Sequence, residues 1–177
     1  MRFDVTTLLA CALAGAFLTG CDGRPPEPPA SGPADPVEAL NRLDPRRPVP
    51  LLPAMAWHQK QNMQQHLVAV EAITHALAHE DWDGVTAAAR TIGTTPDMQR
   101  TCRRMGAGAE GFTDLALEFH QRADAVAEAA ATRDAGAVLR ATSVMLRTCT
   151  ACHATYRQDV VDAATWGART GMTPPGH

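Results

Sequence analysis

The sequence has few aromatic residues, no surplus of basic charge and no hydrophobic run long enough to stay in a bilayer as a helix. Phe, Trp and Tyr make up 5% of the 177 residues, although 45% of the chain is hydrophobic. Sixteen basic residues against 19 acidic ones give a formal net charge of -3. Because such a chain offers no basic field for phosphates, we exclude nucleic acid as a partner. The length fits one modest domain with tails.

The N-terminus carries an apolar run that is shorter than a membrane-spanning helix. Residues Val5 to Leu18 follow Arg2 and are typical of a secretory signal peptide, which we place over residues 1–20. The run ends in Leu18-Thr-Gly-Cys21, which resembles the bacterial lipobox, where the cysteine is lipidated and becomes the first mature residue. Ordinary cleavage nearby, with Cys21 incidental, is the alternative. We expect a bacterial periplasmic protein that Cys21 anchors to the inner or the outer membrane.

Cysteines are too few and too unevenly spaced for a disulfide framework. Of the five, Cys11 leaves with the signal peptide and Cys21 is committed to lipid. The folded part keeps Cys102, Cys149 and Cys152, an odd number, which does not favour paired disulfides in an exported protein. The C-x-x-C pair therefore serves another purpose.

Proline is concentrated in one segment. Ten of the thirteen prolines lie in residues 21–53, among Gly, Ser and charged residues, and this composition predicts an extended linker after the lipid-attachment cysteine. Residues 164–177, with further Gly and Pro, are predicted to be a flexible tail. The folded domain is expected over residues 54–163.

The predicted domain is all-α. It has no convincing alternating strand pattern, and its apolar residues recur every three or four positions. We expect helices over about 55–79, 82–92, 98–105 and 109–132, and a last one that Asp134 caps. Along the last helix, steps of 4, 3, 4, 3 and 4 form a heptad-like seam of Val138, Thr142, Met145, Cys149, Cys152 and Tyr156. Four main helices with short connections predict an antiparallel four-helix bundle; a helical-repeat array is the alternative, but no repeat period is visible.

The stretch Cys149-Thr-Ala-Cys-His153-Ala-Thr-Tyr-Arg157 carries the chemistry. On a helix, Cys149, Cys152 and His153 stand at i, i+3 and i+4 and point to one side. This spacing suits a haem, because two thiols can form thioethers with its vinyl groups while the adjacent imidazole reaches the iron.

Two other uses of this motif fit less well. A structural zinc site needs a second pair of ligands, and the chain offers only Cys102 and scattered histidines. A redox dithiol typically opens a helix after a strand, whereas this pair lies near the end of a helix in an all-α chain.

A C-terminal C-x-x-C-H-x-x-[YF]-R at the end of the last helix of a four-helix bundle resembles the cytochrome c-prime family. The resemblance covers roughly Met55 to Arg157 and is specific at the motif. It implies one covalent haem c on Cys149 and Cys152, with His153 as the proximal iron ligand. It also implies that Arg157 borders the proximal pocket or a propionate; a solvated helix end is the alternative. For Tyr156 the alternative is core packing.

The family's first helix presents one side chain to the open face of the haem. A side chain that cannot bind iron leaves a five-coordinate site for a gas such as NO or CO, whereas a bound methionine gives a low-spin electron carrier. Here the resemblance places Met63 at that position, and Met63 can also pack without bonding. His66 is the rival ligand. Phe112 and Phe119 are candidates for the walls of the haem pocket, with generic core packing as the alternative.

From these residues we expect electron transfer with redox partner proteins rather than an enzyme. A gas-binding protein and a scaffold subunit without redox function are the alternatives. The family's bundles are often dimers, so a homodimer is compatible with the resemblance. Cys102 lies beside Arg103 and Arg104, where its thiol either has a lowered pKa or is simply buried.

Overall fold

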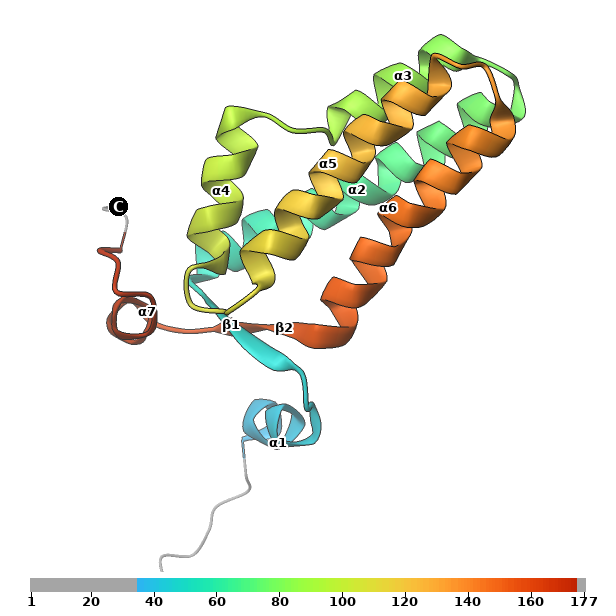
Figure 1. The fold of residues 1–177 in the computed structure, drawn as a ribbon. Helices are drawn as coiled ribbons and strands as arrows, with labels where there is room; N and C mark the ends of the chain where they lie inside the picture. The colour runs from blue at the N-terminus through green and yellow to red at the C-terminus, as the bar shows by residue number, and fades with distance from the viewer. Residues whose placement is uncertain (1–34, 175–177) are drawn as a thin grey trace, which may run out of the picture. The chain divides into compact units, whose positions relative to one another are not determined.

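The computed structural model describes residues 35–174 and divides the chain into two compact units, Met1–Leu43 and Asp44–His177. The described residues form seven helices and one two-stranded sheet, so the chain is mostly helical, as the all-α prediction requires in part (Figure 1). The predicted signal peptide and Cys21 lie outside these residues. In the first unit, α1 (Pro36–Leu43) exposes its apolar side chains. Among residues 35–174, no helix combines the length and the apolar character needed to cross a bilayer.

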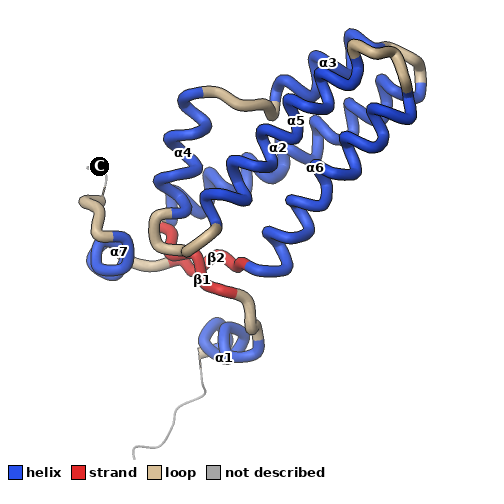
Figure 2. Tube along the Cα trace, viewed as in Figure 1, coloured by secondary structure: helices blue, strands red, loops and turns tan. Residues whose placement is uncertain are grey.

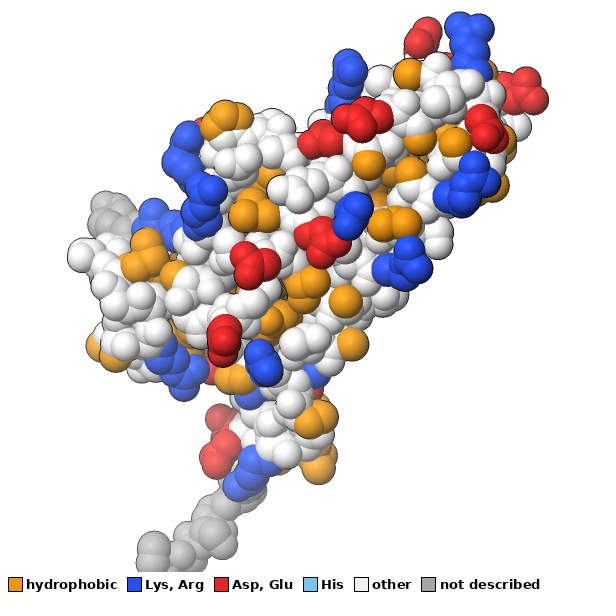
Figure 3. Space-filling model, in the orientation of Figure 1, with side chains coloured by type: hydrophobic (Ala, Val, Ile, Leu, Met, Phe, Trp, Pro, Cys, Tyr) orange, Lys and Arg blue, Asp and Glu red, His pale blue; other side chains and the backbone are white. Residues whose placement is uncertain are grey.

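Four helices of the second unit share the larger core. These helices are α2 (Pro53–Ala78), α3 (Trp82–Thr91), α5 (Phe112–Ala130) and α6 (Ala135–Thr155). Each supplies fully buried apolar side chains, for example Ile73, Val85, Val126 and Met145. On the face shown in Figure 3, hydrophobic side chains lie along the line where α5 meets α6, between charged ones. We call this larger core the helical core.

Most helix starts have a local chemical cause. Asp81 caps α3 by accepting a 2.9 Å hydrogen bond from the Gly84 N–H, and Thr95 caps α4 (Pro96–Gly106) by accepting one of 3.1 Å from the Met98 N–H. Asp134 caps α6 as predicted, through a 2.7 Å bond from the Gly136 N–H. Proline occupies the first turn of α2, where its missing N–H costs nothing.

A parallel two-stranded sheet corrects two expectations. β1 (Arg47–Leu51) pairs with β2 (Tyr156–Val160), in register from Arg47 opposite Tyr156 to Leu51 opposite Val160. The chain is therefore not all-α, and the linker predicted over residues 21–53 is wrong for β1, whose Leu51 is 0% exposed. A two-stranded sheet consists of edge strands, and an edge strand tolerates proline where no N–H has to be donated.

The end of the described chain is also more ordered than predicted. Residues 164–177 were expected to form a flexible tail, yet α7 (Ala163–Thr170) covers their first part. Asp162 caps this helix, and Trp166 is 0% exposed. Because one indole buries a large apolar area, a single tryptophan can hold a short helix against the rest of the fold.

The sheet takes part in a second core, separate from the helical core, which we call the sheet core. It contains Val49 and Leu51 of β1, Ala56 of α2, Met105 of α4, Phe112 of α5 and Tyr156 of β2. Figure 2 shows the strands at the end of the helices where α2 begins and α6 finishes. Gly111 enters α5 with φ of 78°, and a Cβ there would lie 2.9 Å from Tyr156 Oη. This close approach and the left-handed backbone both require glycine.

Candidate functional site

The last turns of α6 bring the two motif cysteines to the junction of the two cores. Cys149 packs against the helical core, and Cys152, one turn later, packs against the sheet core. Both carry free, half-buried thiols, whereas His153 is exposed. The predicted side-by-side placement on one helix is therefore what the structure contains.

The surroundings of the two thiols favour their protonated form. Burial raises the pKa of the Cys149 thiol and of the Cys152 thiol, and the neighbouring Cys149 raises the latter further. An activated redox dithiol would need the opposite shift. Between residues 35 and 174, no three His, Cys, Asp or Glu side chains are grouped closely enough to hold a metal ion, so no second ligand set accompanies the pair there.

The middle of α2, where the sequence predicts the sixth iron ligand, contributes no buried side chain. The buried residues of α2 are Ala56 and then Ala69, Ile73 and Ala76, so residues 57–68 belong to neither core. This stretch nevertheless carries the large apolar side chains of Trp57, Met63, Leu67 and Val68, all of them exposed. A helix of this kind has an apolar surface still available to a bound group.

Met63 and His66 differ in what surrounds them. Met63 is 38% exposed. The His66 ring is half-buried, 4.5 Å from the Phe119 ring and 5.3 Å from the His120 ring, so it packs toward α5. Burial, and secondarily the nearby His120, lowers the pKa of His66 to about 4. At neutral pH its imidazole is therefore uncharged.

Phe112 and Phe119, one heptad apart on α5, lie in the two different cores that meet near the motif cysteines. Phe119 belongs to the helical core, and Phe112 belongs to the sheet core, where its ring lies edge-on to Tyr156 with centroids 5.3 Å apart. Cys149 and Cys152 thus each pack against the core that contains one of these rings. Both phenylalanines serve core packing; a wall around a haem stays a prediction.

Tyr156 does not continue the seam of α6, as the heptad spacing predicted, but is the first residue of β2. Its backbone is extended (φ -122°, ψ 148°), its N–H still reaches Cys152 O, and its hydroxyl donates a 2.5 Å hydrogen bond to Glu110 O. The side chain is buried in the sheet core, so core packing is its observed role. The heptad spacing therefore includes one residue beyond the helix. This is possible because the first side chain of a strand can face the same side as the helix seam before it.

Arg157 is not a solvated helix end either. Its side chain is 14% exposed, and Nη1 lies 3.6 Å from Asp159 Oδ1, an ion-pair distance too long for a hydrogen bond. Within residues 35–174, its buried Nε and Nη1 have no hydrogen-bond partner. Buried guanidinium N–H groups of this kind suit an anionic oxygen.

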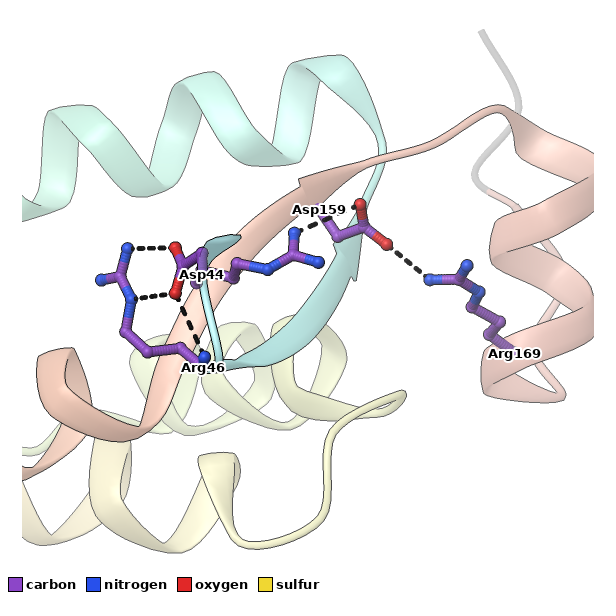
Figure 4. Close-up of polar contacts among 5 residues, drawn as sticks. Asp44, Arg46, Asp159 and Arg169 are labelled. Atoms are coloured by element: carbon purple, nitrogen blue, oxygen red, sulfur yellow. Dashed lines mark hydrogen bonds and ion pairs between the residues drawn. The ribbon is translucent and has the colours of Figure 1, made fainter. Parts of the chain in front are cut away.

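Arg46 and Asp44, which the sequence did not identify as candidate site residues, lie at the end of the motif. Arg46 Nη1 donates a 3.2 Å hydrogen bond to His153 O. Figure 4 shows how Asp44 holds the same guanidinium, through bonds of 2.9 Å from Nε and 2.7 Å from Nη2. The hydrogen bonds from Arg46 lower the pKa of Asp44 to about 2. A D-P-R triplet in a proline-rich segment carries no recognisable signal for this contact.

Cys102 is buried, which favours a plain core thiol over a reactive thiol with a lowered pKa. Desolvation raises the pKa of its thiol to about 11, and its Sγ lies 3.3 Å from Met98 Sδ. The basic neighbours Arg103 and Arg104 point away from the core and do not activate it. The lowered-pKa interpretation is wrong.

Residues 107–157 match the family model described as Cytochrome C'. The matched segment contains α5, α6 and the start of β2, and with them the whole C-x-x-C-H-x-x-Y-R motif. Compared with the curated proteins and with the solved structures, the chain has no significant match. The cytochrome c-prime likeness is thus established for a segment shorter than half of the chain, and α2, β1 and α7 lie outside it.

Proposed function

We propose that the chain is an electron-transfer protein of the cytochrome c-prime type that binds one haem c covalently through Cys149 and Cys152. The observation that carries the proposal is the placement of these thiols and His153 on consecutive turns of α6, at the junction of the two cores. The family match over the same residues supports it. Cytochromes c-prime are haem proteins that are generally not enzymes, and we propose no enzymatic activity.

The residues present fit a haem in three respects. Two protonated, half-buried thiols are placed one helical turn apart for thioether attachment, and the exposed imidazole of His153 is available as an iron ligand. The unburied apolar stretch of α2 offers surface for the flat faces of a macrocycle. The unpartnered N–H groups of Arg157 suit a propionate. When bound, the haem supplies a one-electron redox centre.

Met63 is our proposed sixth ligand. It lies in the unburied stretch of α2, and its thioether needs no deprotonation to bind iron. Thioether ligation raises a haem's reduction potential, which suits an electron carrier. Met63 on α2 and His153 on α6 would then be the two side chains that hold the iron, each on a regular helix.

Gas binding is the second candidate function, and one observation favours it. Because His66 packs toward Phe119 and His120 of α5, its imidazole is engaged there, and Met63 lies beside apolar neighbours such as Leu67. If Met63 packs without bonding, these residues leave the iron five-coordinate and open to NO or CO. A scaffold without redox function is the outcome in which no haem binds.

For location we propose a periplasmic protein tethered by lipid at Cys21, on the strength of the lipobox resemblance. The proline-rich residues after Cys21 would let the domain reach redox partner proteins, and a homodimer is compatible with the family likeness. Replacing Cys21 with Ser should move the protein from the membrane fraction to the soluble fraction. Retention of the variant in the membrane fraction would exclude the anchor.

The visible absorption spectrum of the purified protein, oxidised and reduced and with and without CO, tests the function. We expect a covalently bound haem with low-spin bands that CO hardly changes. High-spin bands that shift readily with CO would replace the carrier with the gas-binding protein. Absence of haem after co-expression with the maturation machinery would exclude both.

A further inference from the structure

We propose that Arg46, oriented by Asp44, is a positioning residue that fixes the iron-binding turn of α6. The inference rests on the proposed haem attachment to Cys149, Cys152 and His153. It concerns a segment outside the family match, since both Asp44 and Arg46 precede residue 107. The segment belongs to the same compact unit as α6.

The turn that carries the motif needs an external support. The last four carbonyl groups of a helix have no intrahelical donor, and helix ends fray for this reason. α6 ends at Thr155, so Cys152 and His153 belong to that last turn. The Tyr156 N–H satisfies Cys152 O. His153 O receives its hydrogen bond from Arg46, which lies 107 positions away in the sequence.

Asp44 gives the Arg46 side chain its direction. The carboxylate binds the guanidinium at two points, through Nε and Nη2, and its Oδ1 also accepts from the Arg46 backbone N–H at 3.1 Å. The remaining donor, Nη1, is thereby aimed at His153 O. Bidentate pairs of this kind fix geometry as well as charge, and a cation at a helix C-terminus is electrostatically favourable.

The strand pair continues this support beyond the helix. β1 begins directly after Arg46, and its first residue pairs with Tyr156, the first residue after α6. On the other side, Gln158 Nε2 donates to Ala56 O at 3.2 Å and to Gln59 Oε1 at 2.6 Å, which ties β2 to α2. The end of α6 is therefore held from both sides, and Arg46 provides the contact to the proximal ligand itself.

The test is hydrogen exchange and spectroscopy on the full chain with haem attached, comparing Arg46→Ala and Asp44→Ala with wild type. In both variants we expect amide exchange over residues 152–157 to accelerate about threefold to tenfold, the loss expected for one solvent-exposed hydrogen bond. We also expect both to broaden the axial-ligand bands of the ferric spectrum. The double variant should match the single ones, because either substitution removes the same contact.

Arg140→Ala is the matched control. Arg140 pairs with Asp134 at 3.5 Å at the opposite end of α6, and its loss should change neither exchange over residues 152–157 nor the spectrum. A purely electrostatic role would shift the reduction potential in opposite directions for Arg46→Ala and Asp44→Ala and leave exchange unchanged; that result would overturn the inference. Wild-type protein without attached haem would instead overturn the proposed function.

Discussion

Met63 and His66 lie three positions apart on α2, but their environments assign them different chemistry. Met63 is 38% exposed, whereas the His66 ring packs against the Phe119 ring with centroids 4.5 Å apart. To bind an iron, His66 would have to give up this packing and its contact with His120.

Replacing Met63 with Ala should therefore convert a low-spin ferric haem to high spin and allow CO to bind the reduced protein readily. His66→Ala is the control and should keep the low-spin bands, since the methionine ligand remains. The measurement is the visible spectrum of each variant in both oxidation states. Loss of the low-spin bands in His66→Ala alone would identify the imidazole as the ligand.

The buried histidine pair also predicts a pH dependence of stability. The pKa of His66 is lowered from 6.5 to about 4, chiefly by burial, and burial lowers that of His120 as well. Between these pH values the unfolded chain binds protons that the folded chain does not bind. The free energy of unfolding of the haem-free protein should thus fall as the pH falls from 6.5 to 4, by about 1–2 kcal/mol after allowance for partial exposure.

Chemical denaturation at several pH values measures this slope. His66→Phe keeps a ring beside Phe119 and should flatten the slope, whereas His58→Gln, at an exposed position of the same helix, should leave it as in wild type. A wild-type stability that is constant between pH 6.5 and 4 would contradict the prediction.

At the residue scale, spacing in the sequence was enough for the motif but not for the environment of each side chain. Cys149, Cys152 and His153 could be placed together because all three lie on one helix. The buried donors of Arg157 and the raised pKa of Cys102 depend on packing between distant segments, which spacing does not contain. The contact of Arg46 with His153 likewise joins segments 107 positions apart and leaves no local pattern.

The helices and the strands differ in how well they can be predicted from the sequence. The helices from α2 to α6 could be predicted to within a few residues because their caps and apolar spacing are local, as at Asp134, whereas α1 and α7 lie in segments predicted as linker and tail. β1 and β2 each have five residues and, within residues 35–174, pair with each other alone, across most of the folded unit. Such short strands carry little local pattern, and proline in β1 made the segment look like a linker.

Leu51 offers a direct test of the role of β1. Its side chain is fully buried in the sheet core, so Leu51→Ala should lower the free energy of unfolding by about 2–5 kcal/mol through lost burial and a cavity. Leu43→Ala is the control, since Leu43 is 82% exposed in α1 and its loss should cost little. Equal denaturation curves for Leu51→Ala and wild type would show that β1 does not pack as described.

For the whole molecule, the structure extends the folded unit beyond the predicted residues 54–163. The unit begins at Asp44, and its ordered elements continue to the end of α7. Composition favoured tails at both ends because prolines and glycines outnumber apolar residues there. The few apolar residues present, such as Leu51 and Trp166, are nevertheless fully buried.

Two shortened chains test this boundary. A chain of residues 44–174 should be about as stable as the full protein, whereas one of residues 54–163 should lose about 5 kcal/mol or more, because it lacks Val49, Leu51 and Trp166. Thermal or chemical denaturation of both measures the difference. Indistinguishable transitions for the two chains would restore the predicted domain limits.

The parallel pairing of β1 with β2 has a consequence for the order of folding. The contact between Arg46 and His153 spans 107 positions, so it has a high contact order and a large loop-closure cost, while the intervening helices form from local contacts. We therefore expect the strand pair to close last, after nearly the whole chain has been synthesised. Until then the last turn of α6 lacks its contacts with Arg46 and β1. The thiols of Cys149 and Cys152 are then accessible to the machinery that would attach a haem.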